Sequence, residues 1–244
     1  MGTSQENYEF HKMMKQNKKA ERVTKRAHDA QMHSDAIADL TFHGWPKIAR
    51  LNRDIVITEK IDGTNAAIGI IESIGAPLRY TIYAQSRTRL LSLYDDNMGF
   101  AAWVEQHRDL LVKTLGPGLH FGEWFGQGIQ RGYGLTEKRF ALFNTARWND
   151  GEGALALANA RLNECAIYCV PVLYQGPWFS QNMPGGPPVY RPEECVSNLH
   201  VFGSVAVPGF RPAEGIVVFH RASGTLLKAT LENDEKPKNS QEVS

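Results

Sequence analysis

Short strand-like runs separated by turn signals constrain the fold of this chain more than any other feature of its sequence. Three such runs, 54–59, 64–71 and 79–85, are rich in Ile, Thr and Tyr, and Asp-Gly and Gly-Ala-Pro turns separate them. Two more runs, 214–220 and 225–231, flank a turn that contains Ser-Gly. Connections this short join antiparallel neighbours. The first three runs are therefore predicted to form an antiparallel meander within an α+β fold.

Helical patterns lie between and before these strands. Residues 96–112 place six mostly apolar side chains on one stripe and end near Gly-Pro, which predicts a helix packed on the sheet. Residues 9–39 lack Pro and Gly and predict a helix, but their apolar positions are too sparse for a core face. Residues 175–192 contain five prolines and three glycines and predict a long surface loop that borders a substrate channel. Further elements are expected as strands at 119–124 and 139–144 and as a helix at 154–164.

The chain is expected to divide into a basic helical N-terminal extension (1–40), one folded domain (41–231) and a polar tail (232–244). Between Lys12 and Arg26 lie seven Lys or Arg and one acid. Such a run fits a phosphate-binding surface and also an ordinary solvated helical face. With 27 basic and 26 acidic side chains the chain has a net charge of only +1, so any attraction to nucleic acid has to come from local clusters.

Composition and missing motifs exclude several classes of protein. The three cysteines lack paired spacing, so neither a disulfide framework nor a structural zinc site is expected. No apolar run approaches membrane-spanning length, and the N-terminus lacks the apolar stretch of a secretory signal, so we expect a cytoplasmic protein with no membrane partner. The motifs of P-loop hydrolases, zincins and α/β-hydrolases are absent.

A lysine, Lys60, ends the first strand-like run and is followed by the turn Asp62-Gly63. A lysine amine is a nucleophile only when it is neutral, which requires desolvation or a nearby positive charge. The run Lys60-Ile61-Asp62-Gly63 resembles motif I, K-x-D-G, of the covalent nucleotidyltransferase superfamily of RNA ligases, DNA ligases and capping enzymes. Taken alone, four residues fit a surface turn equally well.

Companion runs follow in the order of that superfamily's motifs. They are Ser86-Arg87 for motif Ia, Phe121-Gly122-Glu123 for motif III, Phe140-Ala141-Leu142-Phe143 for motif IIIa, Glu214-Gly215-Ile216-Val217-Val218 for motif IV and Leu227-Lys228-Ala229-Thr230 for motif V. Six matches in the same order over residues 59–230 argue against a chance resemblance. Each aromatic still fits a core position, and each acid still fits a salt-bridged strand residue.

For the site residues, the resemblance implies roles around one bound nucleotide. It implies Lys60 as the AMP acceptor; Asp62 and Lys228 as further catalytic residues; Glu59, Gly63, Asn65, Arg87, Glu123, Phe143 and Lys228 as nucleotide contacts; and Glu214 at the catalytic metal. The acid before the nucleophile is expected to accept a hydrogen bond from the adenine amino group, which favours ATP. Phe140 and Phe143 are three residues apart on a strand, so only one of them faces the nucleotide, and Phe143 is the better match.

Motif V departs from the superfamily's K-x-K pattern. Leu226 and Thr230 stand two positions before and after Lys228. Either one phosphate contact is missing or another cation, Lys236 or Lys238, supplies it.

The run 122–131 and the residues around Lys60 look most like the RNA ligases of phages and bacteria. The resemblance implies an α+β, antiparallel-sheet nucleotidyltransferase domain of the ATP-grasp-like ligase adenylation type with flanking helices. Because only a short stretch follows Lys228, we expect no C-terminal OB domain.

The function that follows is ATP-dependent RNA ligation with Mg²⁺, or Mn²⁺ in its place. AMP held on the lysine would pass to an RNA 5′-phosphate, and a 3′-hydroxyl would then seal the strand. The RNA surface would come from the basic helix, residues 130–139, the proline-rich loop or a separate partner protein. Two alternatives stay open: an adenylyltransferase acting on DNA, a protein or a small molecule, and a nucleotide- or RNA-end-binding module without turnover.

Overall fold

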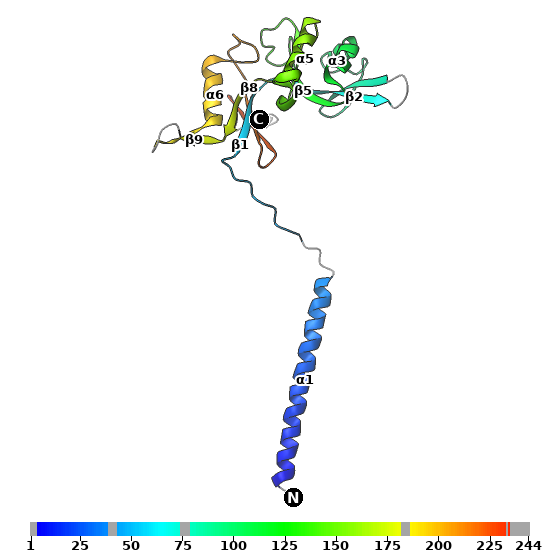
Figure 1. Ribbon diagram of the computed structural model, residues 1–244, viewed down its shortest axis with the longest axis vertical. Coiled ribbons are helices and arrows are strands. Elements are labelled where there is room, and N and C mark those ends of the chain that lie inside the picture. The colour runs from blue at the N-terminus through cyan, green and yellow to red at the C-terminus, as the bar shows by residue number, and fades with distance from the viewer. Residues whose placement is uncertain (1–3, 39–42, 74–78, 182–185, 233, 235–244) are drawn as a thin grey trace, which may run out of the picture. The chain divides into compact units, whose positions relative to one another are not determined.

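The computed structural model describes residues 4–38, 43–73, 79–181, 186–232 and 234, in two compact units, Met1–Ile48 and Ala49–Ser244. The first unit contains one continuous helix, α1 (Ser4–Ala38), drawn in blue in Figure 1. The helix predicted at 9–39 is therefore confirmed and begins earlier. Of the predicted polar tail at 232–244, only Glu232 and Asp234 lie within the described residues. No helix of the described part has the length and apolar character needed to cross a membrane.

Two main sheets form the second unit, in its described part. One is four-stranded, in the order β12-β11-β1-β8, and the other is six-stranded, in the order β4-β3-β2-β5-β6-β7. The four-stranded sheet consists of β1 (Asp54–Lys60), β8 (Val172–Pro177), β11 (Gly215–His220) and β12 (Thr225–Thr230). The six-stranded sheet consists of β2 (Thr64–Ser73), β3 (Arg79–Ser86), β4 (Leu90–Leu91), β5 (Gly118–Gly126), β6 (Lys138–Leu142) and β7 (Ile167–Cys169). All neighbours pair antiparallel except β6 and β7.

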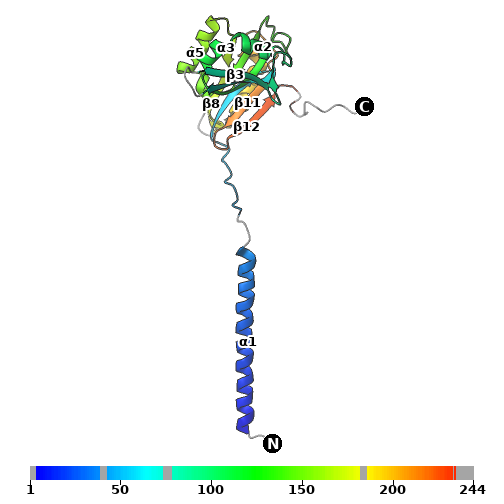
Figure 2. The ribbon, with the colours of Figure 1, turned by 90° about the vertical axis from the view of Figure 1, so that its right-hand side faces the viewer.

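Helices cover one face of each sheet. Figure 2 shows α2, α3 and α5 together beside the six-stranded sheet, where Phe100, Trp124 and Phe140 belong to one buried core. The four-stranded sheet buries Ile55 and Ile57 in a second core that includes Leu199 of α6. The helices are α2 (Phe100–Gln106), α3 (Arg108–Leu115), α4 (Thr145–Trp148), α5 (Gly151–Leu162) and α6 (Arg191–Phe202). Because side chains alternate along a strand, the opposite face of each sheet is left for other contacts.

The predicted meander is wrong at its first strand. β1 pairs with β11 and β8, whereas β2 pairs with β3 and β5. Ile55, Val56 and Ile57 are buried in succession, which suits a strand that lies between two others in a sheet. A Cβ at Gly63 would lie 2.4 Å from the carbonyl oxygen of Trp124. The Asp-Gly turn is therefore a tight passage between two sheets instead of an exposed hairpin.

The helix predicted at 96–112 is confirmed in kind but is broken and begins later. Met98 and Gly99 have φ values of 52° and 79°, which end any helix there, and α2 starts at Phe100. The Asp96 carboxylate accepts hydrogen bonds from the backbone N–H groups of Ala101 at 2.7 Å and Ala102 at 3.1 Å. A single side chain thus satisfies two free donors of the first turn. His107, with φ −108°, separates α2 from α3.

The long loop predicted at 175–192 is also wrong. Its described part contains the end of β8, the hairpin strands β9 (Phe179–Gln181) and β10 (Pro188–Tyr190), and the start of α6. The prolines occupy positions that tolerate them: Pro177 ends β8, Pro188 begins β10 and Pro192 lies in the first turn of α6. Counting prolines therefore overestimated the irregular structure. Gln175, the first residue of this segment, lines the pocket described below, and the substrate channel stays a prediction.

Candidate active site

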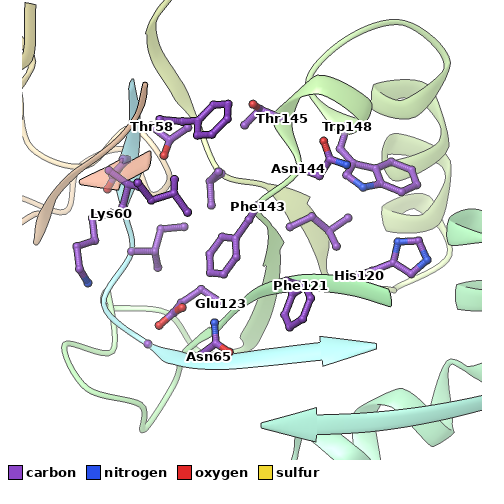
Figure 3. Close-up of a pocket in the computed structure, with 18 of the residues that line it drawn as sticks. Thr58, Lys60, Asn65, His120, Phe121, Glu123, Phe143, Asn144, Thr145 and Trp148 are labelled. Atoms are coloured by element: carbon purple, nitrogen blue, oxygen red, sulfur yellow. The ribbon is translucent and has the colours of Figure 1, made fainter. Parts of the chain in front are cut away.

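A pocket of about 1430 Å³ lies between the faces of the two sheets that the helices leave uncovered. Lys60, Val217 and Leu226 line it from the four-stranded sheet, and Asn65 and Glu123 line it from the six-stranded sheet. Figure 3 shows side chains of both walls pointing into this space. The motif residues, which are far apart in the sequence, therefore converge on one cavity.

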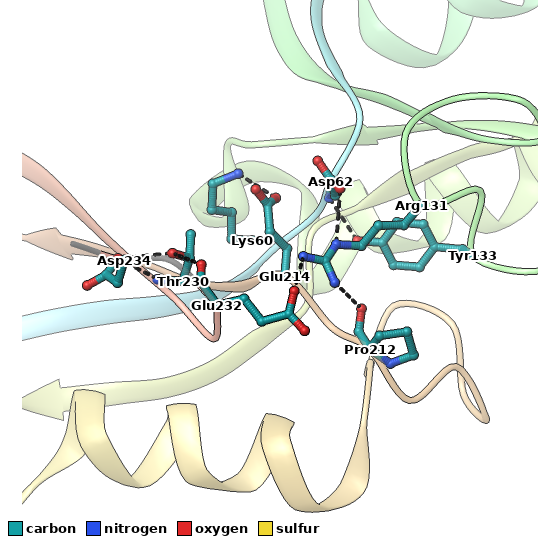
Figure 4. Close-up of polar contacts among 9 residues, drawn as sticks. All are labelled: Lys60, Asp62, Arg131, Tyr133, Pro212, Glu214, Thr230, Glu232 and Asp234. Carbon is teal, nitrogen blue, oxygen red and sulfur yellow. Dashed lines mark hydrogen bonds and ion pairs between the residues drawn. The ribbon is translucent and has the colours of Figure 1, made fainter. Parts of the chain in front are cut away.

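The amine of Lys60 lies at the end of β1 and contacts a buried acid. Its Nζ is 2.5 Å from Oε2 of Glu214, whose side chain is 3% exposed, while that of Lys60 is 19% exposed (Figure 4). The strand register explains this meeting, because Lys60 pairs with Gly215, the residue after the acid. A Cβ at Gly215 would lie 2.1 Å from the carbonyl oxygen of Ala229, so only glycine fits there.

Two residues of the loop that follows β5 hold Asp62, two positions after the lysine, in place. Nε of Arg131 is 3.0 Å from Oδ2 of Asp62, and the hydroxyl of Tyr133 accepts a hydrogen bond of 2.8 Å from the Asp62 N–H (Figure 4). Arg131 also donates to the carbonyl of Pro212, 3.1 Å away, which is two residues before Glu214. One guanidinium therefore connects the segments that carry Lys60 and its acid.

The sequence reasoning missed the roles of Arg131 and Tyr133. Arg131 ends the run 122–131, but nothing in that run predicts a partner 69 positions earlier in the chain. Tyr133 has φ 53°, and Gly128, Gly132 and Gly134 also have positive φ values. The spaced glycines were the available signal, because a loop that alternates left-handed residues is usually built for a specific purpose.

Glu123 lies on the other wall, on the pocket-facing side of β5. Burial raises its pKa to about 7, although the nearby charge of Lys60 acts in the opposite direction, and Glu214 raises it further. The Gly63 N–H and the charge of Arg87 favour its ionised form. Asn65 is its register partner on β2. This carboxyl group is therefore poised to change its protonation near neutral pH.

The two phenylalanines of the predicted base-stacking motif have different environments. Phe140 is fully buried in the core beneath the six-stranded sheet. Phe143 follows β6, is 41% exposed and lines the pocket. Figure 3 shows its ring projecting into the middle of the cavity, and Phe121, on β5, lies nearby. Of the two, Phe143 is the one brought to the pocket.

The Glu59 carboxylate is hydrogen-bonded within the protein, although the residue is one of those that line the pocket. Along β1, Glu59 shares the face of Ile57, which packs toward α6, whereas Lys60 points to the pocket. Its oxygens accept hydrogen bonds from the hydroxyl of Ser204 at 2.5 Å and from the N–H groups of Val205 and Ala206, both at 2.8 Å. Burial raises the pKa of this acid, and these bonds oppose that effect. Glu59 thus anchors the 204–206 segment, and its contact with an adenine stays a prediction.

The two remaining cations lie at the edges of the pocket. Arg87, directly after β3, is exposed and lines it. Lys228 is exposed and is not one of the lining residues, but it pairs with Val217 across β11 and β12, which places it on the same face of the sheet. Leu226 lines the pocket in the position of the expected second cation. Lys236 and Lys238, named above as substitutes, lie outside the described residues.

A comparison with models of protein families identifies one family for this chain. A sequence model of the RNA ligase family matches residues 53–230. No curated protein matches the chain. Among solved structures, a mutant of the Naegleria gruberi RNA ligase with ATP and Mn is 17% identical, with a TM-score of 0.44, over 73% of this chain and 49% of that one.

Two further structures give similar values. Another Naegleria gruberi RNA ligase mutant, with AMP and Mn, is 16% identical, with a TM-score of 0.45, over 78% of this chain and 56% of that one. An archaeal ATP-dependent RNA ligase is 17% identical, with a TM-score of 0.42, over 78% of this chain and 48% of that one. The match thus spans about half the length of each of these proteins. Because the family's sequence model covers well over half of this chain, at residues 53–230, the chain belongs to the RNA ligase family.

Proposed function

We propose that this protein is an ATP-dependent RNA ligase that carries AMP on Lys60 as a lysyl phosphoramidate. The observation that carries the proposal is the Lys60 amine, 2.5 Å from the buried Glu214 carboxylate, in a pocket large enough for a nucleotide. Membership of the RNA ligase family supports it. Residues 41–231 would be the nucleotidyltransferase domain and residues 1–40 a basic extension.

The pocket offers complementary groups to each part of ATP. The exposed ring of Phe143 is available to stack on the base, and Glu123, with Asn65 beside it, can bind ribose hydroxyls. A carboxyl group in an apolar strand gains from such polar partners, because burial alone is unfavourable to it. Arg87, which lines the pocket, and Lys228, on the same sheet face as Val217, are two cations available to the phosphates.

In the first step, the neutral Lys60 amine attacks the α-phosphorus. An N–P bond forms, the bond between that phosphorus and the bridging oxygen breaks, and pyrophosphate leaves. The amine gives up a proton, and Glu214, which already accepts a hydrogen bond from Nζ, is the nearest acceptor. Arg87 and Lys228 offset the negative charge that develops on the phosphate oxygens.

Two transfers complete the proposed cycle. An oxygen of the RNA 5′-phosphate attacks the AMP phosphorus, and the N–P bond breaks as the lysine amine regains a proton. The 3′-hydroxyl then attacks the activated 5′-phosphorus, AMP leaves and a phosphodiester bond joins the strands. Asp62, held by Arg131 and Tyr133, would keep Lys60 in place through these steps.

A divalent cation fits the donor set. Within the described residues, no group of three or more His, Cys, Asp or Glu side chains could hold a metal. Mg²⁺ does not need one, because it commonly binds through one or two carboxylates together with substrate phosphates. The Glu214 carboxylate, with the ATP phosphates, meets that requirement, and Mn²⁺ accepts similar oxygen ligands. When bound, such an ion neutralises charge on the reacting phosphate.

Labelling of the protein tests the first step. The full chain is incubated with Mg²⁺ and ATP labelled at the α-phosphate and is then denatured. We expect label on wild type, none on Lys60→Ala, and wild-type label on Lys47→Ala, an exposed lysine outside the pocket. If wild type carries no label, the proposal fails.

A panel of acceptors tests the later steps. Nicked duplex RNA, single-stranded RNA and nicked DNA, each with a 5′-phosphate and a 3′-hydroxyl, are offered to the labelled protein. We expect transfer of AMP to RNA followed by joining. Label that stays on the protein, or passes only to DNA, would leave nucleotidyl transfer standing and refute RNA ligation.

A further inference from the structure

Helix α1 carries a concentration of positive charge that the proposed reaction does not use. It has seven cations in fifteen residues, at positions Lys12, Lys15, Lys18, Lys19, Arg22, Lys25 and Arg26. Every side chain from residue 12 to 32 is exposed. Among the described residues, none of the seven has an acid within ion-pair distance. Their charges are therefore available to a partner.

The helix gathers these cations on one side. At about 100° per residue, all seven fall within an arc of about 140°. Five of them, Lys12, Lys15, Lys19, Arg22 and Arg26, follow each other at spacings of three and four residues, and Lys18 and Lys25 flank that row. We call this row and its flanking lysines the basic stripe. Glu21 lies outside the arc, about 110° from its middle, and Asp29 comes after its end.

The basic stripe has a cost in the free helix. Like charges three or four positions apart destabilise a helix by about 0.2–0.5 kcal/mol per pair. A sequence under no other demand would alternate the signs of the charges along that face, as solvated helices commonly do. A partner that carries negative charge at regular intervals removes this repulsion. The arrangement thus points to a polyanion.

The remaining surface of α1 distinguishes between two kinds of polyanion. A helix that binds an anionic membrane needs an apolar face with Trp, Phe or Leu. Residues 12–32 contain no Trp, Phe, Leu or Ile, and the side opposite the stripe carries Asn17 and Thr24 beside Met13. The stripe is about 21 Å long at 1.5 Å per residue, which matches on the order of six phosphates of one stacked strand at about 3.4 Å each. These observations favour a nucleic-acid backbone.

We propose that the basic stripe of α1 binds the phosphate backbone of the RNA on which this protein acts. The proposal rests on the proposed function, because that function makes RNA the substrate. Contacts to phosphates hold an RNA without reading its bases, so the stripe should bind strands of any sequence. It therefore supplies affinity for RNA, while the pocket supplies the chemistry.

Two variants of the full chain distinguish the effect of the basic stripe on RNA binding from the effect of net charge. The first, the neutral variant, replaces three cations of the row: Lys15→Gln, Lys19→Gln and Arg22→Gln. The second, the rotated variant, exchanges each cation with the next residue: Lys15→Gln with Gln16→Lys, Lys19→Ala with Ala20→Lys, and Arg22→Val with Val23→Arg. Each exchange turns a charge by about 100° around the helix and keeps the composition of the chain. Circular dichroism checks that helix content is unchanged.

The readout is the Kd for a single-stranded RNA with a 5′-phosphate, measured over a range of salt concentrations. We expect the neutral variant to bind about tenfold more weakly at 0.1 M salt. The slope of log Kd against log salt should fall by about 2, because each lost contact to a single strand removes about 0.7. The rotated variant should lose nearly as much affinity. Binding of either variant at wild-type strength would overturn the proposal.

A membrane partner is tested with the same three proteins. Vesicles with and without an anionic lipid replace the RNA, and stronger binding of wild type to anionic vesicles than to RNA would also overturn the proposal. Label on Lys60 is measured in parallel without RNA. A failure of nucleotidyl transfer is thereby recorded separately from a failure of the stripe to bind RNA.

Discussion

The two sheets that enclose the pocket carry different kinds of residues. The four-stranded sheet contributes Lys60 and, at its edges, Glu214 and Lys228, which are the charged groups of the proposed phosphate chemistry. The six-stranded sheet contributes Glu123 and leads into Phe143, which are suited to the ribose and the base. From this difference we expect phosphate transfer and nucleotide recognition to be separable. Substitutions in the four-stranded sheet should slow the reaction of bound ATP, and substitutions in the six-stranded sheet should weaken ATP binding.

Glu214→Gln should have the largest effect and tests the four-stranded wall. The substitution keeps the shape of the side chain but removes the negative charge 2.5 Å from the Lys60 amine. Loss of one such preorganised group typically lowers a rate by about 10²–10³. We expect single-turnover formation of lysyl-AMP to slow by that amount, with the Kd for ATP changed less than about threefold. Glu232→Gln, an exposed acid near Arg131, is the matched control and should keep the wild-type rate.

Glu123→Gln tests the six-stranded wall through the pH dependence of stability. The pKa of Glu123 is raised to about 7, so from pH 4.5 upwards the unfolded chain loses a proton that the folded protein keeps. The contribution of this group to stability therefore falls as pH rises from 4.5 to 7 and is constant above that. Gln cannot ionise and avoids this loss.

The variant should match wild type near pH 4 and exceed it by on the order of 2–3 kcal/mol at pH 8. Urea unfolding of both proteins at the two pH values measures the difference. A difference that does not change with pH would contradict the assignment of the raised pKa to Glu123. The same variant should bind ATP more weakly, because an amide replaces the carboxylate proposed to bind the ribose.

Phe143→Leu and Phe140→Leu form a matched pair, because the same change is made in the pocket and in the core. Loss of the Phe143 ring should raise the KM for ATP about two- to tenfold, the range of an aromatic contact beyond its buried area, with kcat and stability preserved. Phe140→Leu should lower the free energy of unfolding by about 1–2 kcal/mol and leave KM unchanged. If both variants shift KM equally, the proposed division between pocket and core is wrong.

The sequence predicted those parts of the molecule that depend on local patterns. The strands around Lys60 and Glu214 follow from β-forming runs bounded by turn residues, and the motifs include Lys60, Arg87, Glu123 and Phe143, which line the pocket. What failed depends on distant partners. The second sheet for β1 comes from its pairing with β11, and the Glu59 carboxylate accepts a hydrogen bond from Ser204, 145 positions away. Neither contact leaves a signal near the residues concerned.

Arg131 connects the two walls, and its replacement should give the smallest change in rate. Arg131 belongs to the loop between β5 and β6 of the six-stranded sheet. It contacts Asp62, which follows Lys60, and Pro212, which precedes Glu214. In Arg131→Lys, one ammonium group cannot reproduce a planar fork that reaches both partners. Lys60 should then shift slightly relative to Glu214, because Asp62 would lose its contact with Arg131. The hydrogen bond between the Asp62 N–H and Tyr133 would remain.

We expect lysyl-AMP formation in Arg131→Lys to slow about fivefold with an unchanged KM for ATP, since positioning affects the reacting atoms more than the nucleotide contacts. Arg139→Lys is the matched control, because Arg139 also pairs with a nearby acid, Glu137 at 2.7 Å, but does not contact Asp62. It should retain the wild-type rate. If the KM for ATP rises and the rate of lysyl-AMP formation does not fall, Arg131 acts on the nucleotide-binding residues of the six-stranded sheet. The proposed separation of the two sheets would then not hold where they meet.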